Sequence, residues 1–161
     1  MGRVTLQKVS GVCALLTVVV AIAGFALFAA TDVFDATEAV DALPAVDDDK
    51  AMIAASSWLF TLAPILLLGT VPGLFQALRG TGDVMWFAVL ASVIGGLVII
   101  PSTLIELAVI YEVAAPYVEA GPDAAAELLV LGDALFTMSL LFRLIGDAIF
   151  TGIGGLFFSL A

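Results

Sequence analysis

The sequence ELLVLGDALFTMSLLFRLIGDAIFTGIGGLFFSLA, residues 127–161, is apolar enough to enter a membrane although it contains three charged residues. At about 100° per residue along a helix, Arg143 and Asp147 lie roughly 80° and 40° from Asp133, so the three charges share one face. An ionisable group inside a spanning helix costs on the order of 2.5–3.5 kcal/mol on insertion scales and therefore faces protein or water. The stretch predicts a spanning helix at the inward-facing centre of a small bundle.

The composition of the whole chain is that of a membrane protein. Its 161 residues are 63% hydrophobic and 12% charged, whereas soluble domains average about 45–50% apolar and about 25% charged residues. The apolar residues form several long runs that leave no room for a separate soluble domain. We therefore predict an all-α integral membrane bundle, with a single transmembrane domain over residues 1–161.

Four apolar runs predict four spanning helices, at about 9–30, 51–78, 84–113 and 124–149. The second run would reach roughly 42 Å as one straight helix, against a hydrocarbon core of about 30 Å, so it must tilt or bend. Pro64 and Pro72 can bend it, because proline removes a backbone donor and clashes with the preceding turn. Gly69 and Gly73 flank Pro72 and favour the close approach of another helix.

A polar insert at 31–50 contains seven acidic residues and follows a helical pattern. The spacing predicts a short amphipathic helix at the membrane surface that ends near Pro44, with Asp49 capping the next helix. The alternative of a calcium loop is disfavoured, because the acids lack the alternating spacing and the glycine of such a loop. Asp83 and Asp123 are expected to begin or cap the third and fourth helices.

The basic residues predict the orientation of the chain. Arg3, Lys8 and Arg79 lie at one end of the predicted spans, whereas the loops at the other end contain mainly acids. The positive-inside rule then places the N-terminus in the cytoplasm and the acidic loops 31–50 and 114–126 outside a cell (plasma) membrane that the chain crosses several times.

The apolar tail at 150–161 is too long to continue the fourth helix within a bilayer. We expect a break at 152–155, followed by a truncated fifth helix, in which case the chain is the front part of a longer protein.

Charge and residue usage exclude several functions. The chain has 15 acidic and 5 basic residues, a net charge of −10, no histidine and one cysteine, Cys13. Nucleic acid is therefore not an expected partner. Zinc or haem ligation through histidine and the common Ser-His and Cys-His catalytic pairs are impossible. No phosphate-binding or dinucleotide-binding glycine motif occurs. We predict neither an enzyme nor a cofactor or metal site.

The candidate intramembrane polar site consists of Asp133, Arg143, Asp147 and Glu106. Arg143 and Asp147 are four residues apart and are expected to pair near the cytoplasmic boundary. Asp133 is then the deepest acid without a partner on its own helix. Glu106 lies about 33 Å along the third helix, which places it at the far interface, unless a kink at Pro101 keeps it in the bundle as a proton carrier.

Two resemblances complete the sequence-based interpretation. The acidic loops, the few lysines and the abundance of Ala, Val, Gly and Asp resemble proteins of extreme halophiles. The Gly- and Ala-rich first span with its acidic outer loop, together with LLFRLIGDAIFTGIGGLFFSLA, resembles uncharacterised multi-spanning membrane families of haloarchaea and bacteria. That resemblance implies a fold and a location but no functional residues.

Two functions are compatible with these features. The first is a structural or accessory membrane subunit whose partners are the lipid bilayer and other subunits or a second copy of the chain. The alternative is a small transporter or proton or cation pathway that uses Asp133 and Arg143.

Overall fold

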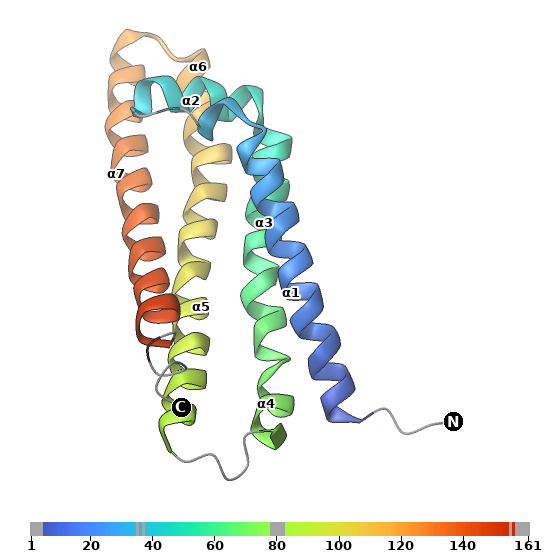
Figure 1. Cartoon of the computed structure of the whole chain (residues 1–161). Coiled ribbons are helices and arrows are strands. Elements are labelled where there is room, and N and C mark those ends of the chain that lie inside the picture. The colour runs from blue at the N-terminus through green and yellow to red at the C-terminus, as the bar shows by residue number, and fades with distance from the viewer. Residues whose placement is uncertain (1–4, 35, 37, 78–82, 155, 157–161) are drawn as a thin grey trace.

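The computed structural model describes residues 5–34, 36, 38–77, 83–154 and 156, which fold almost entirely into helices (Figure 1). Four helices are long and apolar enough to cross a membrane. The all-α class with four spanning helices is therefore confirmed. The helices are α1 (Leu6–Ala29), α3 (Lys50–Leu68) with its continuation α4 (Val71–Ala77), α5 (Asp83–Val109) and α7 (Pro122–Asp147).

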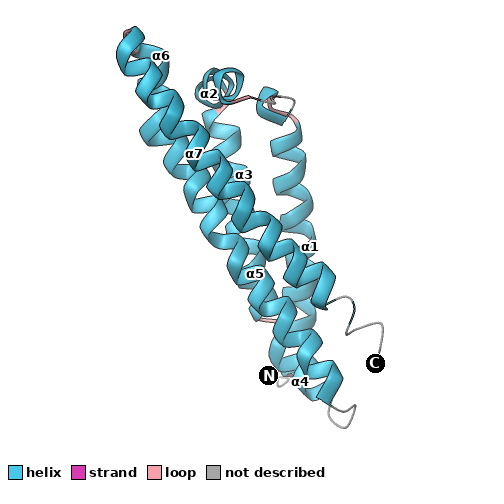
Figure 2. Cartoon of the chain, turned by 90° about the vertical axis from the view of Figure 1, so that its left-hand side faces the viewer, coloured by secondary structure: helices cyan, strands magenta, loops and turns pink. Residues whose placement is uncertain are grey.

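The four long helices form a row in chain order, with α1 packed on α3, α3 on α5 and α5 on α7 (Figures 1 and 2). α5 has a long neighbour on each side, whereas α7 is at the end of the row. In the most apolar part of each span, 39% of the residues are buried for α5 but only 11% for α7. The prediction that the helix of the stretch 127–161, which carries Asp133, Arg143 and Asp147, forms the centre of the bundle is therefore wrong. The central helix is α5, whose long charge-free run allows burial on two sides.

Both α5 and α7 continue beyond their regular parts. α5 extends through a π-helix, η2 (Ile110–Ala114), into α6 (Ala115–Glu119), and α7 extends through a π-helix, η3 (Ala148–Gly154). The expected break does not occur within 152–154. Gly154 instead packs against α5, where an added Cβ would lie 2.8 Å from the Ser92 hydroxyl oxygen. Residues 155 and 157–161, where a fifth span was expected, lie outside the described residues.

The second span bends as expected, between α3 and α4 at Gly69 and Thr70. Ser10 of α1 stabilises the bend: its hydroxyl donates to the Gly69 carbonyl at 3.0 Å and accepts the Gly73 N–H at 2.9 Å. A Cβ on Gly73 would lie 2.4 Å from the Ser10 Cβ. The two glycines therefore allow α1 to approach closely, and one serine hydroxyl bonds to backbone groups on both sides of the bend.

α2 (Ala39–Asp48) follows a short 3₁₀ helix, η1 (Asp32–Phe34), and lies across one end of the row (Figure 1). The predicted amphipathic helix is present, but it continues through Pro44 to Asp48. Leu43 and Val46, on either side of that proline, are both fully buried in the core. Leu43 rests on α7 at Gly132, where an added Cβ would lie 3.1 Å from its side chain. Burial of these residues outweighs the hydrogen bond that Pro44 cannot make.

The predicted helix caps differ in detail. Asp49 is the N-terminal flanking residue of α3, but its carboxylate accepts the Asp32 N–H at 3.1 Å instead of capping the helix. That bond ties the start of η1 to the start of α3. At α7 the flanking residue is Gly121, and Asp123 lies in the first turn. α5 begins at Asp83 as expected, while Arg3 and Arg79, which predict the orientation, are outside the described residues.

The contact between α5 and α7 depends on Gly95, where an added Cβ would lie 2.5 Å from the Phe150 backbone nitrogen and 2.7 Å from the Gly146 carbonyl oxygen. Gly95→Ala therefore forces the helices apart and is expected to cost about 1–3 kcal/mol. Gly11→Ala is the matched control, because an added Cβ there meets nothing within 4 Å. We expect thermal unfolding in detergent, followed by circular dichroism, to show a lower midpoint for Gly95→Ala alone. Equal midpoints would contradict this packing.

Candidate functional site

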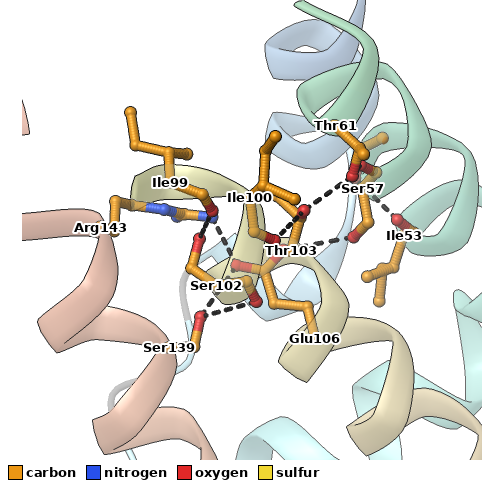
Figure 3. A network of polar contacts seen from close by, with 11 residues as sticks. Ile53, Ser57, Thr61, Ile99, Ile100, Ser102, Thr103, Glu106, Ser139 and Arg143 are labelled. Carbon is orange, nitrogen blue, oxygen red and sulfur yellow. Dashed lines mark hydrogen bonds and ion pairs between the residues drawn. The ribbon is translucent and has the colours of Figure 1, made fainter. Parts of the chain in front are cut away.

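The carboxylate of Glu106, on α5, is the point at which three spanning helices meet (Figure 3). Ser57 of α3 donates a hydrogen bond to its Oε2 at 3.2 Å, and Ser139 of α7 donates to its Oε1 at 3.2 Å. Arg143, one turn beyond Ser139 on α7, donates to the same Oε1 and forms an ion pair with it. Bonds to a charged group are the stronger ones in proteins, so this carboxylate links α3, α5 and α7.

The ion pair is only partly accessible. The Glu106 side chain is 15% exposed and the Arg143 side chain 35%. The guanidinium carbon of Arg143 lies 6.0 Å from the centroid of the Phe60 ring on α3, within the range of a cation–π contact. In the part of the chain that the structure describes, every buried side-chain nitrogen and oxygen has a hydrogen-bond partner. The network therefore meets the condition under which charge is tolerated in an apolar bundle.

Hydroxyl groups extend this network along α5. Thr61 of α3 and Thr103 of α5 share a buried hydrogen bond of 2.7 Å. The Ser102 carbonyl oxygen lies 3.3 Å from the Ser139 hydroxyl and shares the single hydrogen of that hydroxyl with Glu106. Ser57, Thr61 and Ser139 are not among the site residues predicted from the sequence. Their spacing does carry a signal, because Ser57 and Thr61, and likewise Ser139 and Arg143, are four residues apart and share a helix face.

Glu106 is partly buried between α3, α5 and α7, which agrees with the second of the two positions that the sequence allows, a place within the bundle. Its partner Ser57 is seven residues beyond Lys50, hence about 10 Å from the start of α3. α5 also continues for another 13 residues beyond Glu106, through η2 to the end of α6 at Glu119. The helix that carries Glu106 therefore runs past the level at which α3 begins.

The predicted pairing of Arg143 with Asp147 is wrong. Arg143 pairs with Glu106 on the neighbouring helix, and among the described residues Asp147 forms no ion pair. Both Asp147 and Asp133 are exposed. Asp133 adjoins Gly132, on which α2 rests, so it lies at the level of α2 and is not the deepest acid. The charge that joins the helices is instead that of Glu106, whose side chain is partly buried.

A cavity of about 420 Å³ lies beneath α2, with the Glu106–Arg143 pair in its wall. Its lining combines apolar side chains from α2, α3, α5 and α7 with Glu38 and Asp133. Outside it, a shallower depression between α2 and α7 shares Glu38, Ala39 and Asp133 with the cavity. The candidate residues thus separate into two groups: Glu106, Arg143 and Asp133 line this cavity, whereas Asp147 does not.

The geometry defines a class of protein, a helical membrane bundle with an internal ion pair beside a cavity. Comparison with protein-family models, with curated proteins and with solved structures finds no match for this chain. The resemblance to uncharacterised multi-spanning membrane families therefore stays a prediction from the sequence, and function must be argued from the residues themselves.

The two candidate partners of Arg143 can be separated by double-mutant cycles built from Arg143→Gln, Glu106→Gln and Asp147→Asn. Free energies of unfolding, measured in mixed detergent micelles, give a coupling energy for each pair. We expect about 0.5–3 kcal/mol between 106 and 143, because they are in direct contact, and a value near zero between 143 and 147. A larger coupling for the second pair would contradict the network described here.

Proposed function

We propose that this protein is a structural or accessory subunit of a membrane assembly, and that Asp147 contacts a partner helix. The observation that carries the proposal is an exposed carboxylate on an apolar spanning helix, at the residue where α7 continues into η3. Asp147 follows Gly146, where an added Cβ would lie 2.9 Å from the Gly95 carbonyl oxygen. Asp147 therefore lies at the same level of the bundle as Gly95.

That level is close to the centre of the spans. Gly95 is 12 residues beyond Asp83, about 18 Å from the start of α5. Its neighbour Gly96 packs on Pro64, where an added Cβ would lie 3.4 Å from the proline Cβ. Pro64 is 14 residues beyond Lys50, about 21 Å from the opposite end of the bundle. A hydrocarbon core of about 30 Å placed on this bundle therefore contains Asp147.

An exposed acid at this depth is unfavourable against lipid, by about 2.5–3.5 kcal/mol on insertion scales. A polar or basic group on a second helix removes that penalty. The position of α7 at the end of the row supports this interpretation. Among the described long helices α7 packs on α5, and its opposite side is open to a partner. Thr151, exposed and four residues beyond Asp147, extends the polar face. The partner is another membrane subunit or a second copy of this chain.

We propose an orientation of the chain in the membrane from the distribution of its basic residues. The start of α1 and the end of η3 lie at the end of the row opposite α2 (Figure 1). The positive-inside rule places that end in the cytoplasm and the acidic α2 end outside a plasma membrane. No catalytic role forms part of this proposal.

The subunit role is tested with a photo-reactive amino acid introduced at position 151, beside Asp147, or at position 12, an exposed site on α1 (Val12, 56% exposed). After irradiation of membranes that contain the protein, we expect a protein adduct at 151 and only lipid adducts at 12. Asp147→Leu should abolish the adduct at 151, because the partner loses its polar contact. An adduct that persists in Asp147→Leu, or appears equally at 12, would contradict the proposal.

A second candidate function, a proton or cation pathway, is favoured by one observation. The cavity and its outer depression join the α2 end of the bundle to the Glu106–Arg143 pair by way of Asp133. Proton and potassium flux into liposomes separates this function from the first. If the protein transports protons or potassium, the flux into liposomes that contain it should exceed the flux into empty vesicles. The Asp133→Asn variant should then show a flux at least several-fold lower than that of the wild type. Identical flux in wild-type, variant and empty vesicles would eliminate this candidate and leave the subunit role intact.

A further inference from the structure

We propose that the cavity beneath α2 is a binding site for an organic monocation with an apolar body, of the alkylammonium class. This inference rests on the cavity alone and on neither proposed function, so binding can occur without ion flux and without a partner subunit. Its volume of about 420 Å³ falls within the range of roughly 300–1,000 Å³ that small-molecule sites occupy.

The charges around the cavity favour a cation. Three carboxylates, of Glu38, Glu106 and Asp133, face a single guanidinium, that of Arg143. Because Arg143 is paired with Glu106, the remaining charge is that of Glu38 and Asp133. Neither of these side chains has a hydrogen-bond or ion-pair partner elsewhere in the described chain. Two unpaired carboxylates beside apolar walls attract a cation and repel an anion.

The walls determine which kind of cation fits. Apolar side chains make up most of the lining, from Phe28 and Val46 to Ile110 and Phe136. Aromatic rings together with carboxylates recognise ammonium groups, and aliphatic side chains accept the attached hydrocarbon. No three described Cys, Asp or Glu side chains gather closely enough to ligate a metal ion. The chemistry of the walls therefore matches an alkylammonium ion better than a bare metal cation.

The route of entry fits an amphiphilic ligand. Glu38 and Asp133 line both the cavity and the outer depression between α2 and α7, whose other residues include Val40, Leu129 and Val130. Val40 and Val130 are exposed. The mouth thus lies at the level of α2, at the end of the spans, where an amphiphile keeps its charged group near water and its chain near lipid.

Binding is measured by equilibrium dialysis of hexyltrimethylammonium against the full chain in nanodiscs, with subtraction of empty nanodiscs. Hexanoate, an amphiphile with an alkyl chain one carbon shorter and the opposite charge, is the matched probe. We expect saturable binding of the cation and no saturable binding of hexanoate. Hexanoate that binds as tightly as the cation, or a cation signal no larger than that of empty nanodiscs, would overturn the proposal.

Variants then locate the site. Asp133→Asn and Glu38→Gln should each weaken binding of the cation about tenfold, the loss of about 1.4 kcal/mol. Asp41→Asn on α2 and Asp123→Asn on α7 are matched controls, since both residues are exposed and neither lines the cavity. They should leave the affinity unchanged. Equal losses in the controls would mean that surface charge alone attracts the cation.

A third change tests the cavity itself. Ala39 lines both the cavity and the depression, so Ala39→Phe should fill the mouth and remove binding without altering any charge. Circular dichroism of each variant verifies that the helices remain folded. Full affinity in a folded Ala39→Phe protein would place the cation elsewhere and overturn the proposal.

Discussion

The carboxylate of Glu106 is the interaction on which the arrangement of the bundle depends. Two serines and one arginine, from helices on both sides of α5, reach the same group. In an apolar environment the alternative is a buried charge without partners, which costs several kcal/mol. Helix association in membranes receives little from the hydrophobic effect, because lipid is as apolar as leucine. A shared polar group therefore specifies which helices are neighbours, and the small residues at Gly95 and Gly146 determine how closely they approach.

This constraint explains why α5 and not α7 is central. Glu106 of α5 bonds to side chains of the helices on both sides of it, whereas the charged residues of α7 differ in their surroundings. Arg143 is paired with Glu106, whereas Asp147, one turn further along and the last residue of α7, is exposed. The two proposals follow from this division. Asp147 is available to a partner helix, and Asp133 contributes to the mouth of the cavity beneath α2.

The sequence predicts those features that depend on one helix at a time. Apolar runs define four spans because about 20 apolar residues are needed to cross a bilayer, and the bend near Pro72 follows from the excess length of the second run. Pairing between helices is not determined in this way. The angular positions of Asp133, Arg143 and Asp147 on their own helix are compatible with a local Arg143–Asp147 pair, and only the packing of Gly95 on Gly146 brings Glu106 within reach of Arg143. Depth within the bundle is not determined by one helix either, because α7 and the continuation of α5 through η2 into α6 both extend past the level of α2 (Figures 1 and 2).

The central claim is that Glu106 fixes the positions of α3 and α7 relative to each other. Leu62 of α3 and Leu141 of α7 are both exposed and can each be replaced by a spin-labelled cysteine, in a Cys13→Ser background that removes the native thiol. Pulsed electron paramagnetic resonance in a lipid bilayer then measures the distance between the two labels. We expect a narrow distance distribution that broadens or shifts in Glu106→Leu but is unchanged in Asp133→Asn. A distribution that is the same in all three proteins would contradict the central claim.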